Sequence, residues 1–147
     1  MKRILGIGNA LTDILLQVSE GDLREIGFAK GSMNLINAEQ FELLQSRFIS
    51  VRKHLVAGGS ASNTVSAIAQ LGGKAAFIGK IGSDEVGKFY REDLIKNNVT
   101  PLLLTSELMS GCCIVLITPD GERTFCTYLG AAADMRAEDI SREAFAK

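Results

Sequence analysis

The chain has 147 residues, with 16 Lys and Arg against 17 Asp and Glu, and 46% of its residues are hydrophobic. This size and composition predict one soluble globular domain whose core needs neither disulfide bonds nor a metal. The charges are scattered and form no basic stripe, which argues against nucleic-acid binding. Apolar runs stay far short of the roughly 20 residues that span a bilayer. Asn9 and Asp13 interrupt the first of them, so we expect no membrane segment, no export and a cytoplasmic location.

The cysteines and the histidine do not have the spacing of a metal site. Cys112 and Cys113 are adjacent, Cys126 stands apart, and the single His54 is distant in sequence. No Cys-x-x-Cys motif occurs, so we expect no metal ligands in this chain. We interpret the cysteines as small buried thiols on strands, in a reducing compartment.

The elements expected in the first third of the chain are short strands followed by a helix. The apolar run Ile4–Gly8 predicts a central strand buried on both faces. Further strands are expected over residues 14–18 and 32–36. Asn37 then stands in an N-cap position before a helix whose apolar residues recur at helical spacing as far as Phe48.

A glycine pair, Gly58-Gly59, follows the next expected strand, which covers residues 53–56. A regular apolar pattern then predicts a helix over about 62–71, with Ser60 or Ser62 as its cap. Adjacent glycines let the backbone approach a ligand closely, and ligands of α/β proteins bind outside the carboxyl ends of strands. The glycine pair is therefore a candidate binding site, although an ordinary tight turn explains it equally well on spacing alone.

The second half of the chain predicts one more strand and helix and then a hairpin. We expect a strand over residues 75–78, a glycine-rich loop over 79–82 and a helix from Ser83 to about Lys96. Two β-prone runs flank the Asp120-Gly121 turn, which is a strong hairpin signal. The β-rich segments near residues 14–36 and 112–129 interrupt the βα alternation. We expect them to form a separate small sheet that covers the carboxyl edge of a βαβ core as a lid.

Four segments together resemble the ribokinase-like, or PfkB, family of carbohydrate and nucleoside kinases. They are Gly8–Asp13, Gly58–Asn63, Gly79–Gly87 and Thr118–Thr124. The second and third are similar to the family's amino-terminal signature. The resemblance implies the amino-terminal part of a three-layer α/β ribokinase-like fold, with a small β-sheet lid at about residues 12–36 and 112–129. It also implies ATP-dependent transfer of a phosphoryl group, assisted by Mg²⁺, to the hydroxymethyl group of a sugar or nucleoside.

The resemblance extends to the residues that bind the acceptor. Asp13 resembles the family's acidic residue that holds substrate hydroxyls, and Asn9 would support the same ribose-like diol. Gly58 and Gly59 would bring backbone groups to the sugar, and Asn63 would contact a further hydroxyl. On spacing alone, a turn cap at Asp13 and an exposed position in the first helical turn at Asn63 explain these residues equally well.

Four more residues complete the expected substrate site. Ser60 lies in the same signature as the glycine pair. Leu11, Leu129 and Ala131 are candidates for lining a pocket for a base or sugar face, although core packing is the simpler explanation for all three.

The main departure from the family concerns its carboxyl-terminal half, where the ATP site, the Gly-Ala-Gly turn and the catalytic aspartate lie. This chain contains no Asp-x-x-Gly-Ala-Gly-Asp segment. We therefore expect residues 1–147 to be the amino-terminal part of a longer kinase, without a catalytic base and inactive alone. We also expect a homodimer through the lid.

Two alternatives stay open at this point. One is a non-catalytic binding or dimerisation module in place of a kinase part. The other concerns the acceptor: Gly-Gly-Ser-x-x-Asn and Gly-Asn-x-Leu-x-Asp resemble the adenosine-kinase-like branch, which favours a nucleoside slightly over a free sugar.

Overall fold

The computed structural model describes residues 3–142 and 145. Its chain forms two compact units, each assembled from segments that are distant in sequence. The first unit comprises residues 1–12, 57–111 and 130–147, and the second comprises residues 13–56 and 112–129.

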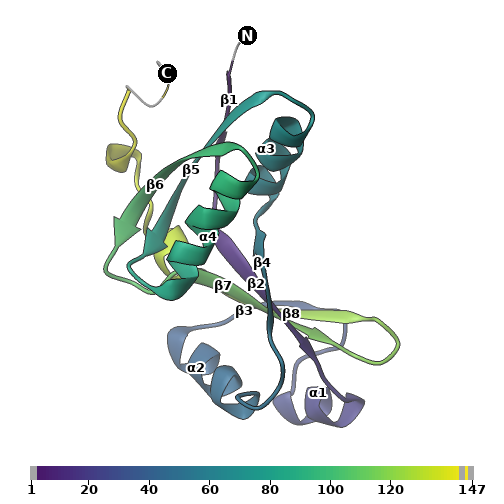
Figure 1. Ribbon diagram of the computed structural model, residues 1–147. Coiled ribbons are helices and arrows are strands. Elements are labelled where there is room, and N and C mark those ends of the chain that lie inside the picture. Colours follow the sequence, from purple (N-terminus) through teal and green to yellow (C-terminus); the bar gives the residue numbers. More distant parts are fainter. Residues whose placement is uncertain (1–2, 143–144, 146–147) are drawn as a thin grey trace. The chain divides into compact units, whose positions relative to one another are not determined.

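The first unit is built on a three-stranded parallel sheet in the order β1-β5-β6 (Figure 1). Its strands are β1 (Arg3–Ile7), β5 (Lys74–Gly82) and β6 (Val99–Ser106). In this sheet β5 is central, and its residues 75–82 are all buried. The register places Ala75 beside both Ile4 and Val99.

Two helices, α3 (Ser60–Gln70) and α4 (Glu85–Lys96), pack on one face of this sheet. Strand residues alternate between faces, and Ala75, Phe77 and Ile81 of β5 point toward the helices. Together with side chains from α3, α4 and β6 they form the core of the unit. Its buried members are Ala10, Val65, Ala69, Ala75, Phe77, Ile81, Tyr90, Leu94 and Val99.

A carboxyl-terminal segment contacts the same sheet and is held there by Lys80 of β5. This segment contains two short 3₁₀ helices, η1 (Gly130–Asp134) and η2 (Ala137–Asp139). The Lys80 ammonium lies 3.2 Å from Asp134 Oδ2 and 2.9 Å from Asp139 Oδ2. Lys80 is nearly buried, and an ammonium at such a position needs paired carboxylates.

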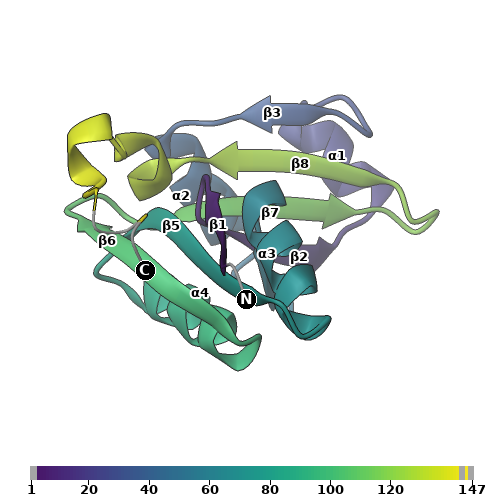
Figure 2. The ribbon, with the colours of Figure 1, turned by 90° about the horizontal axis from the view of Figure 1, so that it is seen from above.

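The second unit contains most of a five-stranded sheet in the order β3-β8-β7-β2-β4, and Figure 2 shows β3, β8, β7 and β2 side by side. The strands are β2 (Leu11–Gln17), β3 (Met33–Leu35), β4 (His54–Gly58), β7 (Gly111–Ile117) and β8 (Arg123–Tyr128). The antiparallel β7–β8 pair confirms the predicted hairpin, and β3 runs parallel to β8. The structure also confirms that the β-rich segments form a sheet distinct from the βαβ sheet.

Helices α1 (Glu20–Ile26) and α2 (Ala38–Arg47) belong to the second unit. Both begin with a capping box, in which the cap and the third helical residue exchange hydrogen bonds. Ser19 and Asp22 form the first box, and Asn37 and Gln40 form the second, as the sequence predicts for Asn37. On α2, Phe41 stacks on Tyr128 of β8 with ring centroids 5.3 Å apart.

The three cysteines are free thiols buried in β7 and β8, which confirms their interpretation as core residues. Burial raises the pKa of the Cys126 thiol to about 12, so this thiol is neutral at physiological pH.

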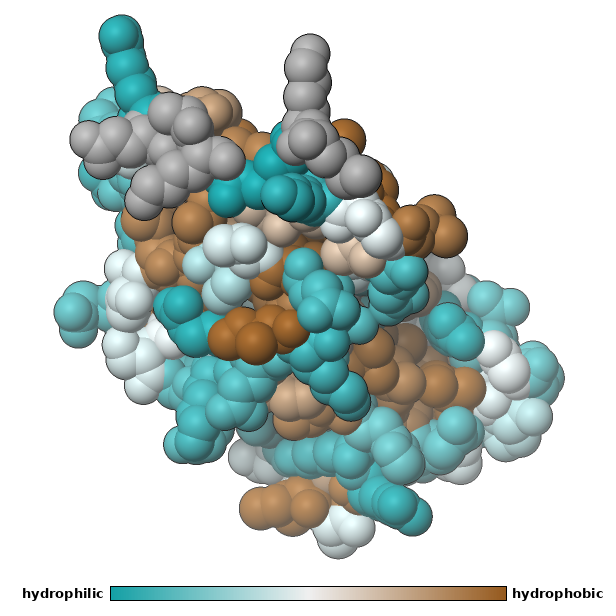
Figure 3. All heavy atoms as spheres, turned by 45° about the horizontal axis from the view of Figure 1, so that its top comes forward, coloured by the Kyte–Doolittle hydropathy of each residue, from teal (hydrophilic) through white to brown (hydrophobic). Residues whose placement is uncertain are grey.

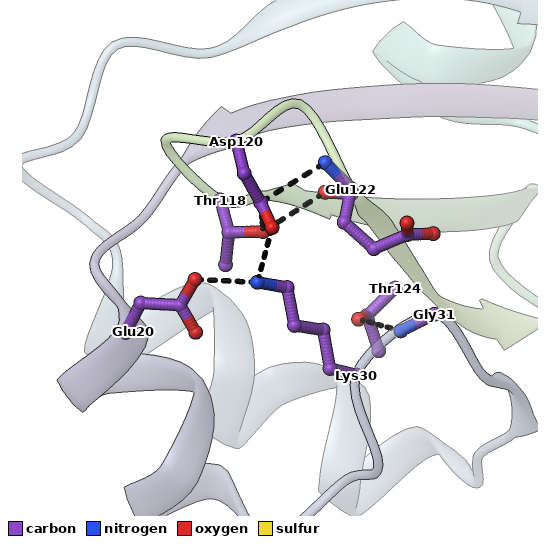
Figure 4. Close-up of polar contacts among 7 residues, drawn as sticks. All are labelled: Glu20, Lys30, Gly31, Thr118, Asp120, Glu122 and Thr124. Atoms are coloured by element: carbon purple, nitrogen blue, oxygen red, sulfur yellow. Dashed lines mark hydrogen bonds and ion pairs between the residues drawn. The ribbon is translucent and has the colours of Figure 1, made fainter.

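The tip of the β7–β8 hairpin is tied to the loop between α1 and β3 (Figure 4). Lys30 Nζ lies 2.6 Å from Asp120 Oδ2 and also pairs with Glu20. Next to this pair, the Gly31 amide donates to Thr124 Oγ1 at 3.0 Å. The tip of the hairpin is therefore fixed by groups some ninety positions earlier in the chain.

Three local predictions are wrong. First, β1 is an edge strand, with Ile4 and Ile7 exposed at 48% and 41%, because β5 occupies the centre of its sheet. Second, residues 79–82 are not a loop but the buried end of β5, where glycines allow close packing. Third, α3 begins two residues early and has Gly59 as its N-cap, with no side-chain cap from Ser60 or Ser62.

Besides the 3₁₀ helices η1 and η2, the sequence analysis missed one helix and one strand. The segment expected to be β-rich contains helix α1, which has only one fully buried residue, Leu23, and so gives a weak apolar pattern. Strand β6 contains Pro101 and half-exposed leucines, which obscure the strand signal.

Hydrophobic side chains also reach the surface of the molecule, as the face in Figure 3 shows. Large exposed examples on the second unit are Met33 and Leu35 of β3 and Leu43 of α2. Among the described residues, no helix is both long and apolar enough to cross a membrane.

Candidate functional site

The glycine pair lies at the point where β4 ends and α3 begins. Gly58 is the last residue of β4 and is buried. Gly59 has a φ of 94°, a backbone conformation that favours glycine. A Cβ atom at Gly59 would lie only 2.5 Å from the carbonyl oxygen of Asn9. The pair therefore allows two loops to touch through their backbones.

Helix α3 begins directly after this pair, and no side chain caps its N-terminus. Its first intrahelical bond runs from the Asn63 amide to the Gly59 carbonyl, at 2.9 Å. An uncapped helix start presents backbone N–H donors and a partial positive charge, which suit the oxygen atoms of a ligand. The side chains of Ser60 and Asn63 are exposed at this end of the helix.

The loop after β1 forms the other side of the contact. The Gly8 amide donates to the carbonyl of Ile78 on β5 at 3.2 Å. Gly79 of β5 is close enough that a Cβ there would lie 3.2 Å from both the Ala10 Cβ and the Gly8 carbonyl oxygen. This packing buries Ala10 and leaves the neighbouring Asn9 exposed. The structure thus brings Asn9, Gly58 and Gly59 together within one unit.

Tyr90 is a contact of the glycine pair that the sequence analysis missed. Its hydroxyl donates to the Gly58 carbonyl at 3.0 Å, and its ring is buried in the core beside Phe77. A tyrosine at an apolar helix position is the available sequence signal, because a buried hydroxyl needs a polar partner.

Asp13 lies on β2 in the second unit and is half-buried. Burial raises the pKa of its carboxyl, and no hydrogen bond from the described residues offsets this effect. The pKa of Cys113 on the neighbouring strand β7 is raised mainly by burial, and the charge of Asp13 raises it further. A desolvated carboxylate without a donor is suited to accept hydrogen bonds from hydroxyl groups of a ligand.

The three apolar candidates differ in burial. Ala131, in η1, is fully buried and donates its amide to the Met109 carbonyl at 2.8 Å, so its side chain packs as a core residue. Leu11 begins β2 and Leu129 follows β8, and both are half-buried. Leu129 belongs to the second unit and Ala131 to the first.

Comparison with protein-family models gives a match over residues 31–147 to the family described as pfkB family carbohydrate kinase. Among curated proteins, the aminoimidazole riboside kinase of Salmonella typhimurium is 45% identical over 88 residues, which are 56% of this chain and 27% of that enzyme. Fructokinase-2 of Zea mays is 40% identical over 80 residues, covering 53% of this chain and 24% of that enzyme.

Solved structures of kinases are similar to this chain over nearly its whole length. The adenosine kinase of Sinorhizobium meliloti is 38% identical with a TM-score of 0.83, covering 95% of this chain and 43% of that one. The Anopheles gambiae adenosine kinase in complex with P1,P4-di(adenosine-5) tetraphosphate is 28% identical with a TM-score of 0.87, covering 97% and 44%. The chain therefore has the fold of the corresponding part of these kinases and spans less than half of their length.

Proposed function

We propose, since the chain belongs to the pfkB family of carbohydrate kinases, that it supplies the acceptor-binding part of an ATP-dependent kinase. The acceptor would be a sugar or nucleoside that is phosphorylated on its hydroxymethyl group. The observation that carries this proposal is the contact between Gly59 and the Asn9 carbonyl at the uncapped start of α3. Relatives named for adenosine, aminoimidazole riboside and fructose give the range of acceptors, and the 38% identical adenosine kinase favours a nucleoside.

In this proposal Asp13 accepts hydrogen bonds from two neighbouring hydroxyls of the acceptor, with Asn9 supporting the same diol. Backbone groups of Gly58 and Gly59 contact the sugar, and Ser60 and Asn63 contact a further hydroxyl. Leu11 and Leu129, which are half-buried, contribute apolar surface near the bound acceptor, whereas the fully buried Ala131 remains a core residue. Phosphoryl transfer depends mostly on positioning, so the task of these residues is to hold the hydroxymethyl group in place for attack.

In the whole enzyme, ATP would be the phosphoryl donor, and Mg²⁺ would neutralise charge on the transferred phosphoryl group. Among the residues that the structure describes, no group of three or more His, Cys, Asp or Glu side chains could hold a metal ion. We propose no catalytic base within residues 1–147, because the family's Asp-x-x-Gly-Ala-Gly-Asp segment does not occur in this sequence. The three buried thiols support a location in a reducing compartment such as the cytoplasm.

The lid role and a homodimer are part of the same proposal. Strand β3 is an edge of the five-stranded sheet, and its Met33 and Leu35 are exposed at 76% and 74%. Exposed apolar side chains on a sheet edge favour association with another strand. This surface is also what a non-catalytic dimerisation module would use. A Met33→Lys, Leu35→Lys double variant that leaves the sedimentation coefficient of the chain unchanged would contradict the proposed dimer.

The proposal is tested by titrating adenosine and fructose into the chain in a calorimeter. We expect one of them to bind, and Asp13→Asn to weaken that binding at least tenfold, because each charge-assisted hydrogen bond contributes about 1.5–3 kcal/mol. Asp120→Asn, a matched carboxylate change at the hairpin tip, should bind like wild type. If neither compound binds, or if both variants bind equally well, the acceptor site is not where we place it.

A further inference from the structure

The glycine pair has no side-chain contacts of its own that could fix its backbone conformation. Neither Gly58 nor Gly59 has a side chain, and glycine loses more conformational freedom on ordering than any other residue. The helix that follows has no side-chain cap to fix its start. Whatever holds the backbone in this conformation must therefore come from other elements of the first unit.

Tyr90 of α4 provides such a contact. Its hydroxyl donates to the Gly58 carbonyl at 3.0 Å and lies 3.8 Å from the position that a Cβ of Gly59 would occupy. The Tyr90 side chain is 1% exposed, and its ring lies 6.0 Å from that of Phe77 between centroids. The rigid core thus fixes the ring, and the ring fixes the hydroxyl.

The hydroxyl of Tyr90 is not needed to fill the core. Phenylalanine would occupy nearly the same volume among Leu94, Val65 and Phe77. Burying a hydroxyl costs free energy unless it is hydrogen-bonded, so a tyrosine here in place of phenylalanine indicates that the hydroxyl is needed for a hydrogen bond. The Gly58 carbonyl, which immediately precedes Gly59 with its positive φ, is the group that this hydroxyl orients.

We propose that Tyr90 is a positioning residue for the acceptor site, holding the Gly58-Gly59 backbone at the start of α3 through the hydrogen bond to the Gly58 carbonyl. The expected effect on acceptor binding rests on the proposed function, whereas the hydrogen bond that fixes the glycine pair does not depend on it. Tyr90 itself does not contact the acceptor. Its effect passes through the glycine pair and, through the Gly59 carbonyl, to the Asn63 amide.

The test uses Tyr90→Phe, which removes only the hydroxyl. By NMR we expect the ¹³C shift of the Gly58 carbonyl to move upfield and the Asn63 amide shift to change. By calorimetry we expect affinity for the acceptor that the wild type binds, adenosine or fructose, to fall about five-fold or more, as for a lost hydrogen bond. Tyr128→Phe, the change of the other tyrosine in the chain, should leave the Gly58 signal and the affinity unchanged.

A second control separates positioning from stability. Val99→Ala removes volume from the same core without touching the hydroxyl, so it should lower the unfolding temperature while the acceptor affinity stays at the wild-type value. Wild-type affinity and an unmoved Gly58 carbonyl signal in Tyr90→Phe would overturn the inference. If the wild type binds neither compound, the proposed function fails, and the Gly58 and Asn63 signals still decide whether Tyr90 positions the glycine pair.

Discussion

Lys30 and Asp120 form an ion pair, 2.6 Å between Nζ and Oδ2, that joins the loop after α1 to the tip of the β7–β8 hairpin (Figure 4). The two residues are 90 positions apart in sequence. Lys30, with help from the Thr118 hydroxyl, lowers the pKa of the Asp120 carboxyl from 3.8 to about 2. This pair fixes a tip whose sequence, Pro119-Asp120-Gly121, encodes the turn but not its attachment.

Replacing Lys30 by methionine should raise the pKa of Asp120 toward 3.8, because the main cause of its lowering is removed. In wild type, the Asp120 carboxylate contributes stability above pH 3.8, and this contribution is lost as the pH falls from 3.8 to about 2. A titration of the Asp120 side-chain carboxyl ¹³C shift would measure both values. Lys88→Met, on helix α4 of the first unit, serves as a control, and an unmoved Asp120 titration in Lys30→Met would contradict the assignment.

Gly59→Ala should destabilise the chain strongly, by about 2–4 kcal/mol, through a positive φ and a backbone clash together. A matched control is Gly72→Ala. Gly72 has a φ of 86°, close to the 94° of Gly59, but open space around its Cβ position. Urea unfolding of both variants separates the two causes. Equal losses of free energy of unfolding would mean that the 2.5 Å approach of the Asn9 carbonyl is relieved at little cost.

Local sequence patterns predicted those features that depend on a few neighbouring residues. The Asn37 cap and the hairpin around Gly121 each rely on a local hydrogen bond or turn conformation. Helix α4 begins at Glu85 with Asp84 as its cap, two residues after the predicted start at Ser83. The wrong predictions concern features that depend on residues close in space but distant in sequence. Whether β1 is central depends on which strands flank it, and the run Gly79–Gly82 reads as a loop until Ala10 and Gly8 are seen packed against Gly79.

The same distinction between local and long-range features applies to the candidate site. The motif located Gly58, Gly59 and Asn9, because glycine and amide patterns are visible in sequence. It did not reveal Tyr90, which reaches Gly58 from 32 positions away. It also did not show that Ser60 leaves α3 uncapped, since a serine beside a helix start is normally expected to cap it.

Asp13→Asn should separate stability from binding. Burial raises the pKa of Asp13 above 3.8 in the folded chain, so the ionised carboxylate destabilises the fold at neutral pH. The asparagine variant is therefore expected to unfold at a higher temperature than wild type at pH 7 while it loses acceptor affinity. The gain should fade as the pH falls through the raised pKa and vanish below about 3.8, where the aspartate is protonated in both states. Thermal unfolding at pH 7 and pH 3 measures this, and a loss of stability at pH 7 would contradict it.

Lys80→Met should release the segment that contains η1 and η2 from the sheet of the first unit. Lys80 holds Asp134 and Asp139. The Ser106 hydroxyl and then the Lys80 ammonium lower the pKa of Asp134 below 3.8, and the Lys80 ammonium and then the Arg136 amide lower that of Asp139 below the same value. Those carboxylates add stability above pH 3.8 that is lost as the pH falls through their lowered pKa values. The pKa of Lys80 itself is raised above 10.5, mainly by the hydrogen bond to Asp139. Its contribution is accordingly complete below pH 10.5 and is lost at higher pH.

Hydrogen exchange at the Ala131 amide reports on this release, because that amide donates to the Met109 carbonyl at 2.8 Å within the same unit. In Lys80→Met we expect at least tenfold faster exchange at Ala131, whereas α4 amides such as that of the buried Leu94, in the last turn of the helix, keep their wild-type protection. Lys80→Arg should restore much of the protection, since a guanidinium can still pair with both carboxylates. Lys88→Met, which removes an exposed lysine from α4, should exchange like wild type. Unchanged exchange at Ala131 in Lys80→Met would show that the apolar contacts of η1, chiefly those of Ala131 and Ala132, hold the segment without the buried ammonium.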